Sequence, residues 1–166
     1  MAGGKSNGNE LAITRVFDAP VELVWKAWTE PEHFKKWWGP EHFSCPVSKI
    51  DFKVGGKYLA CMRGAGPDGM VKDYWSTGTY KEIIPFKKIV ATDSFADENG
   101  NIVSAAHYGM EGMPMEMQVI LAFEEQGEKT KMVLRHVGMP AGEMQKMAGQ
   151  GWNESFDKLA ASLIGK

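Results

Sequence analysis

Residues 143–164 have the sequence EMQKMAGQGWNESFDKLAASLI, and this stretch decides the fold. Its apolar residues recur at spacings of three and four, the period of an amphipathic α-helix. They are Met144, Met147, Ala148, Trp152, Phe156, Leu159, Leu163 and Ile164. We predict a helix of about six turns at 3.6 residues per turn. Gly149 and Gly151 lower the helix propensity of its first half.

The chain before this helix has the pattern of an antiparallel sheet. Apolar residues alternate at 115–123 and again at 132–137 with Gln126-Gly127 between them, which predicts a hairpin with one covered face. We expect Trp152 and Phe156 to pack against the first of these strands. Five further strands are predicted, and turn residues separate them. One lies near the start of the chain, at residues 11–17, and the other four are at residues 46–54, 57–63, 73–84 and 88–95. Residues 101–114 are predicted to form a loop.

Two short helices are expected between the first strand and the others. A helix is predicted over residues 20–29, because Asp18 can serve as an N-cap, Pro20 suits the first turn and Glu22 places a carboxylate in that turn. A second begins near Pro31 and ends at Gly39-Pro40. The segment Trp37-Trp38-Gly39-Pro40 is expected either to plug one end of the fold or to form part of a cavity mouth.

The order of these elements predicts one α+β domain over residues 10–166, after a disordered lead-in at residues 1–9. Six to seven antiparallel strands curl as they twist, and only the C-terminal helix is long enough to cover their apolar face. A curled sheet wrapped around one helix tends to leave space between them, where small ligands bind.

Composition narrows the partners and the compartment. The 19 basic and 21 acidic residues nearly cancel, so we expect no nucleic acid. No apolar run approaches the length of about 20 residues that spans a bilayer, and residues 1–10 do not form a secretory signal. Cys45 and Cys61 are expected to be free thiols in the cytoplasm. Both a monomer and a homodimer stay open.

Six short motifs resemble a known superfamily. They are DAPVELVWKAWTEP at 18–31, KKWWGP at 35–40, VGGKY at 54–58, PDG at 67–69, GTYKEIIP at 78–85 and GWNESFDKLA at 151–160. In this order they resemble the START/Bet v 1-like (SRPBCC) superfamily, and within it the branch similar to the C-terminal domain of the activator of Hsp90 ATPase. The resemblance covers about residues 10–166.

The resemblance implies the helix-grip fold: a curved antiparallel sheet, two short helices after the first strand and a long C-terminal helix across the concave face. It also implies a cavity between sheet and helix, since members bind lipids, polyketides, plant hormones or other apolar molecules, and some are enzymes. The eukaryotic Hsp90 activator has a further N-terminal domain for which this sequence has no room, so we do not expect a co-chaperone role.

Eleven methionines and six tryptophans among 166 residues fit either a filled core or a ligand cavity. Strand alternation places Tyr58, Ala60 and Met62 on one face, and Trp75, Thr77 and Thr79 on one face of another strand. Whichever of these faces is concave would line the cavity. The candidate cavity residues are Trp38, Tyr58, Met62, Trp75, Tyr80, Phe95, Met117, His136, Trp152 and Phe156.

The residue pattern points to binding rather than catalysis. His33, His42, His107 and His136 lack metal-ligand spacing, and no nucleophile elbow or nucleotide fingerprint occurs, so we expect no catalytic residue, metal or cofactor. His136 belongs to the covered face of its strand, where a satisfied, neutral histidine is expected. The predicted function is binding of a small apolar or aromatic molecule.

Two alternatives stay open. One is an enzyme of the polyketide-cyclase type that uses the same cavity, with His136 or Tyr80 as the acid or base. The other is a protein-interaction module whose partner is a chaperone or a similar client.

Overall fold

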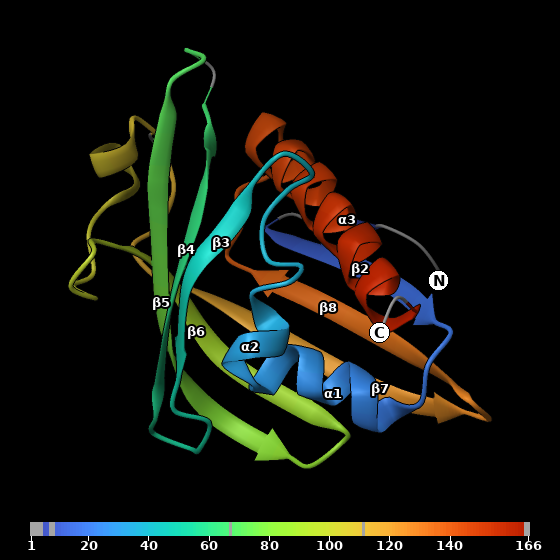
Figure 1. Cartoon of the computed structure of the whole chain (residues 1–166). Coiled ribbons are helices and arrows are strands. Elements are labelled where there is room, and N and C mark those ends of the chain that lie inside the picture. Colours follow the sequence, from blue (N-terminus) through green and yellow to red (C-terminus); the bar gives the residue numbers. More distant parts are fainter. Residues whose placement is uncertain (1–4, 7–8, 67, 111, 165–166) are drawn as a thin grey trace.

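An antiparallel sheet wraps around one long helix in this protein (Figure 1). The structure is a computed structural model that describes residues 5–6, 9–66, 68–110 and 112–164. Within these residues the chain forms the strands β1 (Lys5–Ser6), β2 (Glu10–Phe17), β3 (Ser44–Ile50), β4 (Lys57–Ala65), β5 (Val71–Ile84), β6 (Lys88–Ala96), β7 (Met117–Gln126) and β8 (Lys129–Val137). The helices are α1 (Val21–Thr29), α2 (Pro31–Phe34), the 3-10 turn η1 (Ala105–Tyr108) and α3 (Glu143–Ile164).

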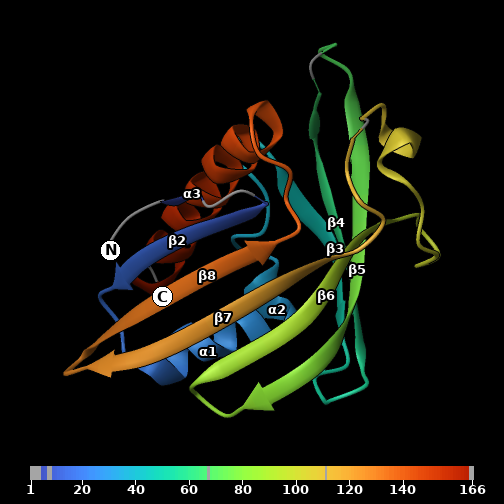
Figure 2. The same ribbon diagram turned by 180° about the vertical axis from the view of Figure 1, so that it is seen from behind.

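The strand order explains how the sheet closes on the helix. The eight strands of the described residues follow the order β1-β2-β8-β7-β6-β5-β4-β3, and every neighbouring pair is antiparallel. α3 crosses one face of the sheet, and α1 and α2 cover the lower part of the same face (Figure 1). From behind, the sheet lies in front of all three helices (Figure 2). This confirms the predicted helix-grip fold.

Register decides which side chains face the helices, because directly opposed residues of antiparallel strands share a face. Met117 lies opposite Asp93, and Val119 lies opposite both Ala91 and His136. On β4, Tyr58 lies opposite Gly78 of β5. These residues share their face with the buried core under α1 and α3, so theirs is the concave face.

Phe156, in the C-terminal half of α3, lies within a cluster of aromatic rings. Phe156 has no solvent exposure, and its ring lies 6.3 Å from that of Phe17 on β2 and 6.2 Å from that of Trp28 on α1. Trp152 stands one turn earlier and contacts His136 on β8. The sequence predicts that both rings pack against the strand at 115–123. Their ring contacts are instead with β2, β8, α1 and the Trp37-Trp38 segment, since the strand order places β2 and β8 under α3.

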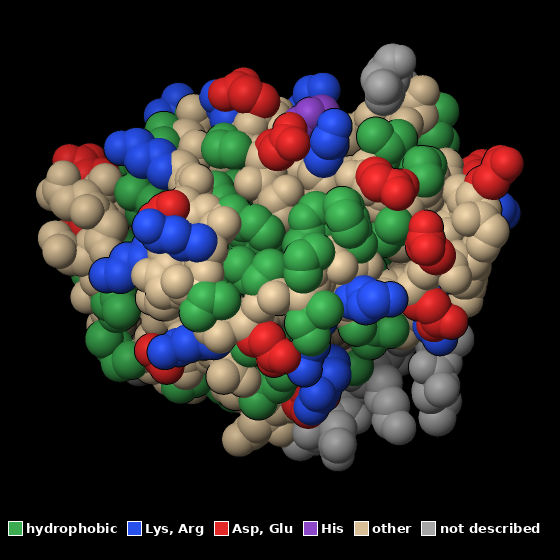
Figure 3. Space-filling model, turned by 90° about the horizontal axis from the view of Figure 1, so that it is seen from below, with side chains coloured by type: hydrophobic (Ala, Val, Ile, Leu, Met, Phe, Trp, Pro, Cys, Tyr) green, Lys and Arg blue, Asp and Glu red, His purple; other side chains and the backbone are tan. Residues whose placement is uncertain are grey.

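α1 closes the lower end of the grip. Seen from below, this end has apolar side chains at its centre and charged side chains around them (Figure 3). In the turn between β5 and β6, Phe86 packs its ring 5.5 Å from that of Trp25 on α1 and stays 44% exposed.

Some element bounds differ from the sequence-based predictions. β3 ends at Ile50, because residues 51–56 form a turn in which a Cβ on Gly56 would lie 2.0 Å from the carbonyl oxygen of Asp51. β7 begins at Met117, and Met115 is 51% exposed. The predicted loop at 101–114 contains η1, whose Tyr108 hydroxyl donates to the carbonyl of Ala96 and so ties the turn to β6.

The N-terminal prediction also needs a correction. Lys5–Ser6 pair with β2, opposite Ala12 and Leu11, so a disordered lead-in does not hold at these two residues. Backbone hydrogen bonding to an exposed strand edge overrides their polar composition. The rest of that prediction at residues 1–4 and 7–8 lies outside the described residues. Among the described helices, none has the length and apolarity needed to cross a membrane.

Both cysteines are buried free thiols, and we predict that they stay unreactive in the folded protein. Burial raises the pKa of Cys45 and of Cys61 to about 11, so almost no thiolate forms at neutral pH. Alkylation without reductant at pH 7 should label neither cysteine in the native protein and both after denaturation. Mass spectrometry reads the result, and an unlabelled denatured protein would show a disulfide.

A second prediction concerns the packing of α3. Phe156→Ala should lower the free energy of unfolding by about 3–5 kcal/mol, because it empties a fully buried ring position. The control is Asp157→Ala on the exposed side of the same turn, where loss of an ion pair with Arg15 should cost less than about 1 kcal/mol. Urea unfolding measures both. Equal losses in the two variants would contradict this placement of the helix.

Candidate functional site

The described residues line two cavities between the concave face and the helices. The larger, which we call the outer cavity, has a volume of about 320 Å³, and the smaller, the inner cavity, about 40 Å³. The outer cavity is lined by residues of the segment 38–40, of strands β4 to β8 and of the first half of α3. The inner cavity lies deeper, against Trp28 of α1 and Phe34 of α2. The space predicted between sheet and helix is therefore present.

Methionine dominates the walls of the outer cavity. Seven of the chain's 11 methionines line it: Met62, Met110, Met113, Met117, Met139, Met144 and Met147. A thioether side chain is unbranched and polarizable, so it adapts to apolar surfaces of different shape. The methionine excess noted in the sequence thus belongs to this cavity rather than to the tightly packed core.

Four side chains form one line of hydrogen bonds between the two cavities, which we call the polar chain. The Trp152 indole Nε1 donates to Nδ1 of His136 over 3.1 Å. Nε2 of His136 lies 2.9 Å from Oδ2 of Asp93. The Tyr58 hydroxyl donates to the other oxygen, Oδ1, over 3.0 Å. The chain therefore links α3, β8, β6 and β4.

The hydrogen-bond donors and acceptors of each side chain determine where the protons of the polar chain lie. An indole N–H only donates, so Nδ1 of His136 accepts and its proton must sit on Nε2. His136 is then neutral and donates to Asp93, which accepts from His136 and Tyr58 as a carboxylate. Burial, followed by the negative charge of Asp93, raises the pKa of Tyr58 well above its usual value. The polar chain carries one net negative charge.

Local backbone features hold the members of this chain in place. A Cβ on Gly78 would lie 2.6 Å from the Tyr58 ring, so the glycine leaves room for that ring against β5. From α3, Lys158 donates to the carbonyl oxygens of Pro40 and Phe43, at 3.1 and 2.9 Å. Desolvation lowers the pKa of Lys158. These bonds fix the segment that carries Trp38 at the cavity wall.

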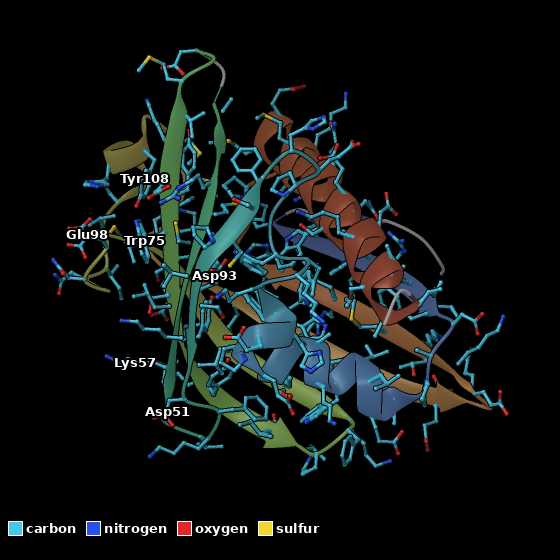
Figure 4. All side chains as sticks on the ribbon, viewed as in Figure 1. Asp51, Lys57, Trp75, Asp93, Glu98 and Tyr108 are labelled. Carbon is cyan, nitrogen blue, oxygen red and sulfur yellow. The ribbon has the colours of Figure 1, made fainter. Side chains whose placement is uncertain are left out.

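The polar chain separates the cavities. Tyr58 lines the inner cavity, His136 the outer one, and Asp93 and Trp152 line both, as does Trp38. Asp93 lies on the side of the sheet that faces the helices, whereas Trp75 lies toward the other side (Figure 4). A molecule in the outer cavity would meet Asp93 and His136 as polar groups on an otherwise apolar wall.

The structure brings most of the candidate residues to these two cavities. Trp38 and Trp152 line both, Tyr58 and Tyr80 the inner one, and Met62, Trp75, Phe95, Met117 and His136 the outer one. Their contact with a ligand stays a prediction. Phe156 lines neither cavity, because it is fully buried between β2 and the short helices.

The side chain of Trp75 points to the face of the sheet opposite to that of Tyr58. It lies opposite Cys61 on β4, so its side chain shares the convex face with Cys61 rather than the face of Tyr58 and Met62. Of the two strand faces considered for the cavity, only the one with Tyr58 is concave. The Trp75 backbone N–H donates to the Tyr108 hydroxyl, which fixes this end of β5 against η1.

The two roles considered for Trp37-Trp38 are divided between the two residues. Trp37 is fully buried and donates from Nε1 to the carbonyl of Ala27 over 2.9 Å, so it plugs the core. Trp38 lines both cavities. Sequence reasoning missed Asp93, although its spacing of two from Phe95 places it on the same strand face. Among the described residues, no group of His, Cys, Asp and Glu side chains could hold a metal ion.

The fold and its cavity define the class: this is a helix-grip protein of the START/Bet v 1-like kind. A family model, Activator of Hsp90 ATPase homolog 1-like protein, matches residues 18–163. The chain belongs to that family. Among curated proteins, none matches the sequence.

Solved structures of other proteins share the fold. The solution structure of a protein from Arthrobacter aurescens superposes with a TM-score of 0.77 at 26% identity, covering 99% of this chain and 92% of the other. A crystal structure from Chromobacterium violaceum gives 0.75 at 27% identity, with 93% and 96% covered. The AHSA1 protein from Silicibacter pomeroyi gives 0.71 at 24% identity, with 93% and 96% covered, a likeness of fold alone.

A third prediction tests the polar chain. Tyr58→Phe removes the hydroxyl that donates to Asp93 and should cost about 1–3 kcal/mol of unfolding free energy, because a buried carboxylate oxygen loses its partner. Tyr80→Phe is the matched control, since the Tyr80 hydroxyl has no hydrogen bond within the described part of the chain. We expect it to cost less. Equal costs by chemical denaturation would show that the Tyr58–Asp93 bond adds no stability.

Proposed function

We propose that this protein binds a small apolar molecule in the outer cavity and does not convert it chemically. The observation that carries the proposal is a cavity of about 320 Å³ lined by seven methionines, with the polar chain along one wall. Ligand sites are concave and mostly apolar, with a few placed polar groups that orient the ligand. Family membership supports the same function at the level of ligand or protein binding.

The volume of the outer cavity limits the size of the ligand. Small-molecule sites usually measure about 300–1,000 Å³, so this cavity is at the compact end of the range. It suits a molecule of one or two rings better than a long-chain lipid. Among the apolar ligands that the superfamily resemblance implies, the compact aromatic ones are favoured here.

The geometry gives the enzyme alternative less support than binding. Both ring nitrogens of His136 are engaged, Nδ1 by Trp152 and Nε2 by Asp93, so neither is free to take a proton from a substrate. Burial, with a smaller contribution from the charge of Asp51, raises the pKa of Tyr80 far above neutral pH. Neither His136 nor Tyr80 therefore has the properties expected of a general acid or base at neutral pH.

The protein-partner alternative rests on the family name, and a pull-down that retains a chaperone would support it. We also propose a reducing compartment such as the cytoplasm. The two buried free thiols support that placement.

A fourth prediction tests binding directly. A flat phenolic compound such as 2-naphthol should bind saturably and raise the melting temperature, because a ligand of the folded state stabilises it by mass action, about 2.7 kcal/mol at 100 Kd. Ala148→Phe should abolish the shift by filling the outer cavity from α3. Ala161→Phe, an exposed position on the same helix, is the control and should keep it.

Thermal melts and calorimetry measure both variants. If no compound of a diverse apolar panel shifts the melt of the unmodified protein, the cavity is not a ligand site. If Ala148→Phe binds as tightly as Ala161→Phe, the ligand lies elsewhere.

A further inference from the structure

We propose that the ligand of the outer cavity is a compact apolar amine whose protonated nitrogen binds the carboxylate of Asp93. This inference rests on the proposed binding function and names the chemical class of ligand that the site prefers. It starts from a charge that the cavity does not balance.

The negative charge of Asp93 has no cationic partner in the cavity walls. Among the described residues that line the two cavities, none is a lysine or an arginine. His136 donates a hydrogen bond to Asp93 but brings no positive charge. It is neutral because its Nδ1 accepts a hydrogen bond from the Trp152 indole. Charges that are largely removed from water are normally paired, so a cation would complement the half-buried Asp93 carboxylate.

Asp93 is also accessible and has acceptor capacity left. Its side chain is 16% exposed, and it lines the outer cavity. His136 bonds one of its oxygens and Tyr58 the other. An ionised carboxylate has about four lone-pair sites, so each oxygen can accept one more bond from a ligand.

Aromatic walls next to the carboxylate favour the same kind of ligand. Trp38 and Trp152 line both cavities together with Asp93, and their rings lie 5.4 Å apart at an angle of 81°. Tryptophan faces attract cations and also contact flat apolar rings. A protonated amine on a small ring system would use the carboxylate, the tryptophans and the methionine walls at once.

The same arrangement selects against carboxylic acids. Two negative charges repel strongly where water is scarce, and no lysine or arginine of the described lining offsets that repulsion. Fatty acids and aromatic acids are therefore disfavoured. Neutral alcohols should fall between the amine and the acid, since a hydroxyl can donate to Asp93 but brings no charge.

Three ligands with one ring system test this order. Calorimetry at pH 7 measures the Kd of 1-naphthylmethylamine, 1-naphthalenemethanol and 1-naphthoic acid for the full chain. We expect the amine to bind at least about 10-fold more tightly than the acid, with the alcohol between them, as charge-assisted hydrogen bonds imply. In Asp93→Asn the advantage of the amine over the alcohol should fall to about twofold or less.

Asp18→Asn is the matched control, because it removes one exposed negative charge outside both cavities and should leave all three Kd values unchanged. The ranking in the unmodified protein decides the question even where Asp93→Asn does not fold. If the alcohol binds and the amine has no advantage, or Asp93→Asn keeps that advantage, the inference is overturned and the binding function stands. If none of the three compounds binds, the inference is overturned, and the diverse apolar panel decides the binding function.

Discussion

The packing of α3 on the concave face is the contact on which the rest of the structure depends. In the second half of the helix, Phe156 and Leu159 are fully buried and pin it to β2 and the short helices. In the first half, Met144 and Met147 line the outer cavity, and the helix also carries two glycines there. The second half of the helix thus fills the space against the sheet with large apolar side chains. The other half supports a cavity, because thioethers and glycines leave more room and adapt more easily.

In the proposed binding site, the polar chain is the feature that would give the outer cavity a preference among apolar ligands. Burying a carboxylate is costly unless it is hydrogen-bonded, and Asp93 meets that cost with donors from two other strands. Because the chain continues through His136 to Trp152, it also joins the sheet to α3. A connected polar network in a low-dielectric interior favours one arrangement of its members. Stability of the helix contact and chemistry of the cavity wall are therefore coupled.

Sequence reasoning came close to the site and missed its central residue. Alternation along single strands grouped Tyr58 with Met62 and placed Met117 on a covered face, and Phe95 was a further candidate. All four line a cavity. It left open which face of β5 is concave. Only the pairing of β5 with β4 answers this, because it places Trp75 opposite Cys61. Asp93 was overlooked since an acidic residue in a strand usually marks a solvent face.

The sequence by itself determined the kinds of elements, their order, the amphipathic C-terminal helix and the excess of methionine and tryptophan. These follow from local periodicity and composition, which each segment carries without its neighbours. Tertiary structure decided which strand faces are concave, how the methionines gather at one cavity and which atoms of His136 accept and donate. Those features depend on the register between strands and on contacts such as Tyr58 with Asp93 and His136 with Trp152. No local period records them, because each joins residues that only the assembled sheet and helix bring within hydrogen-bonding distance.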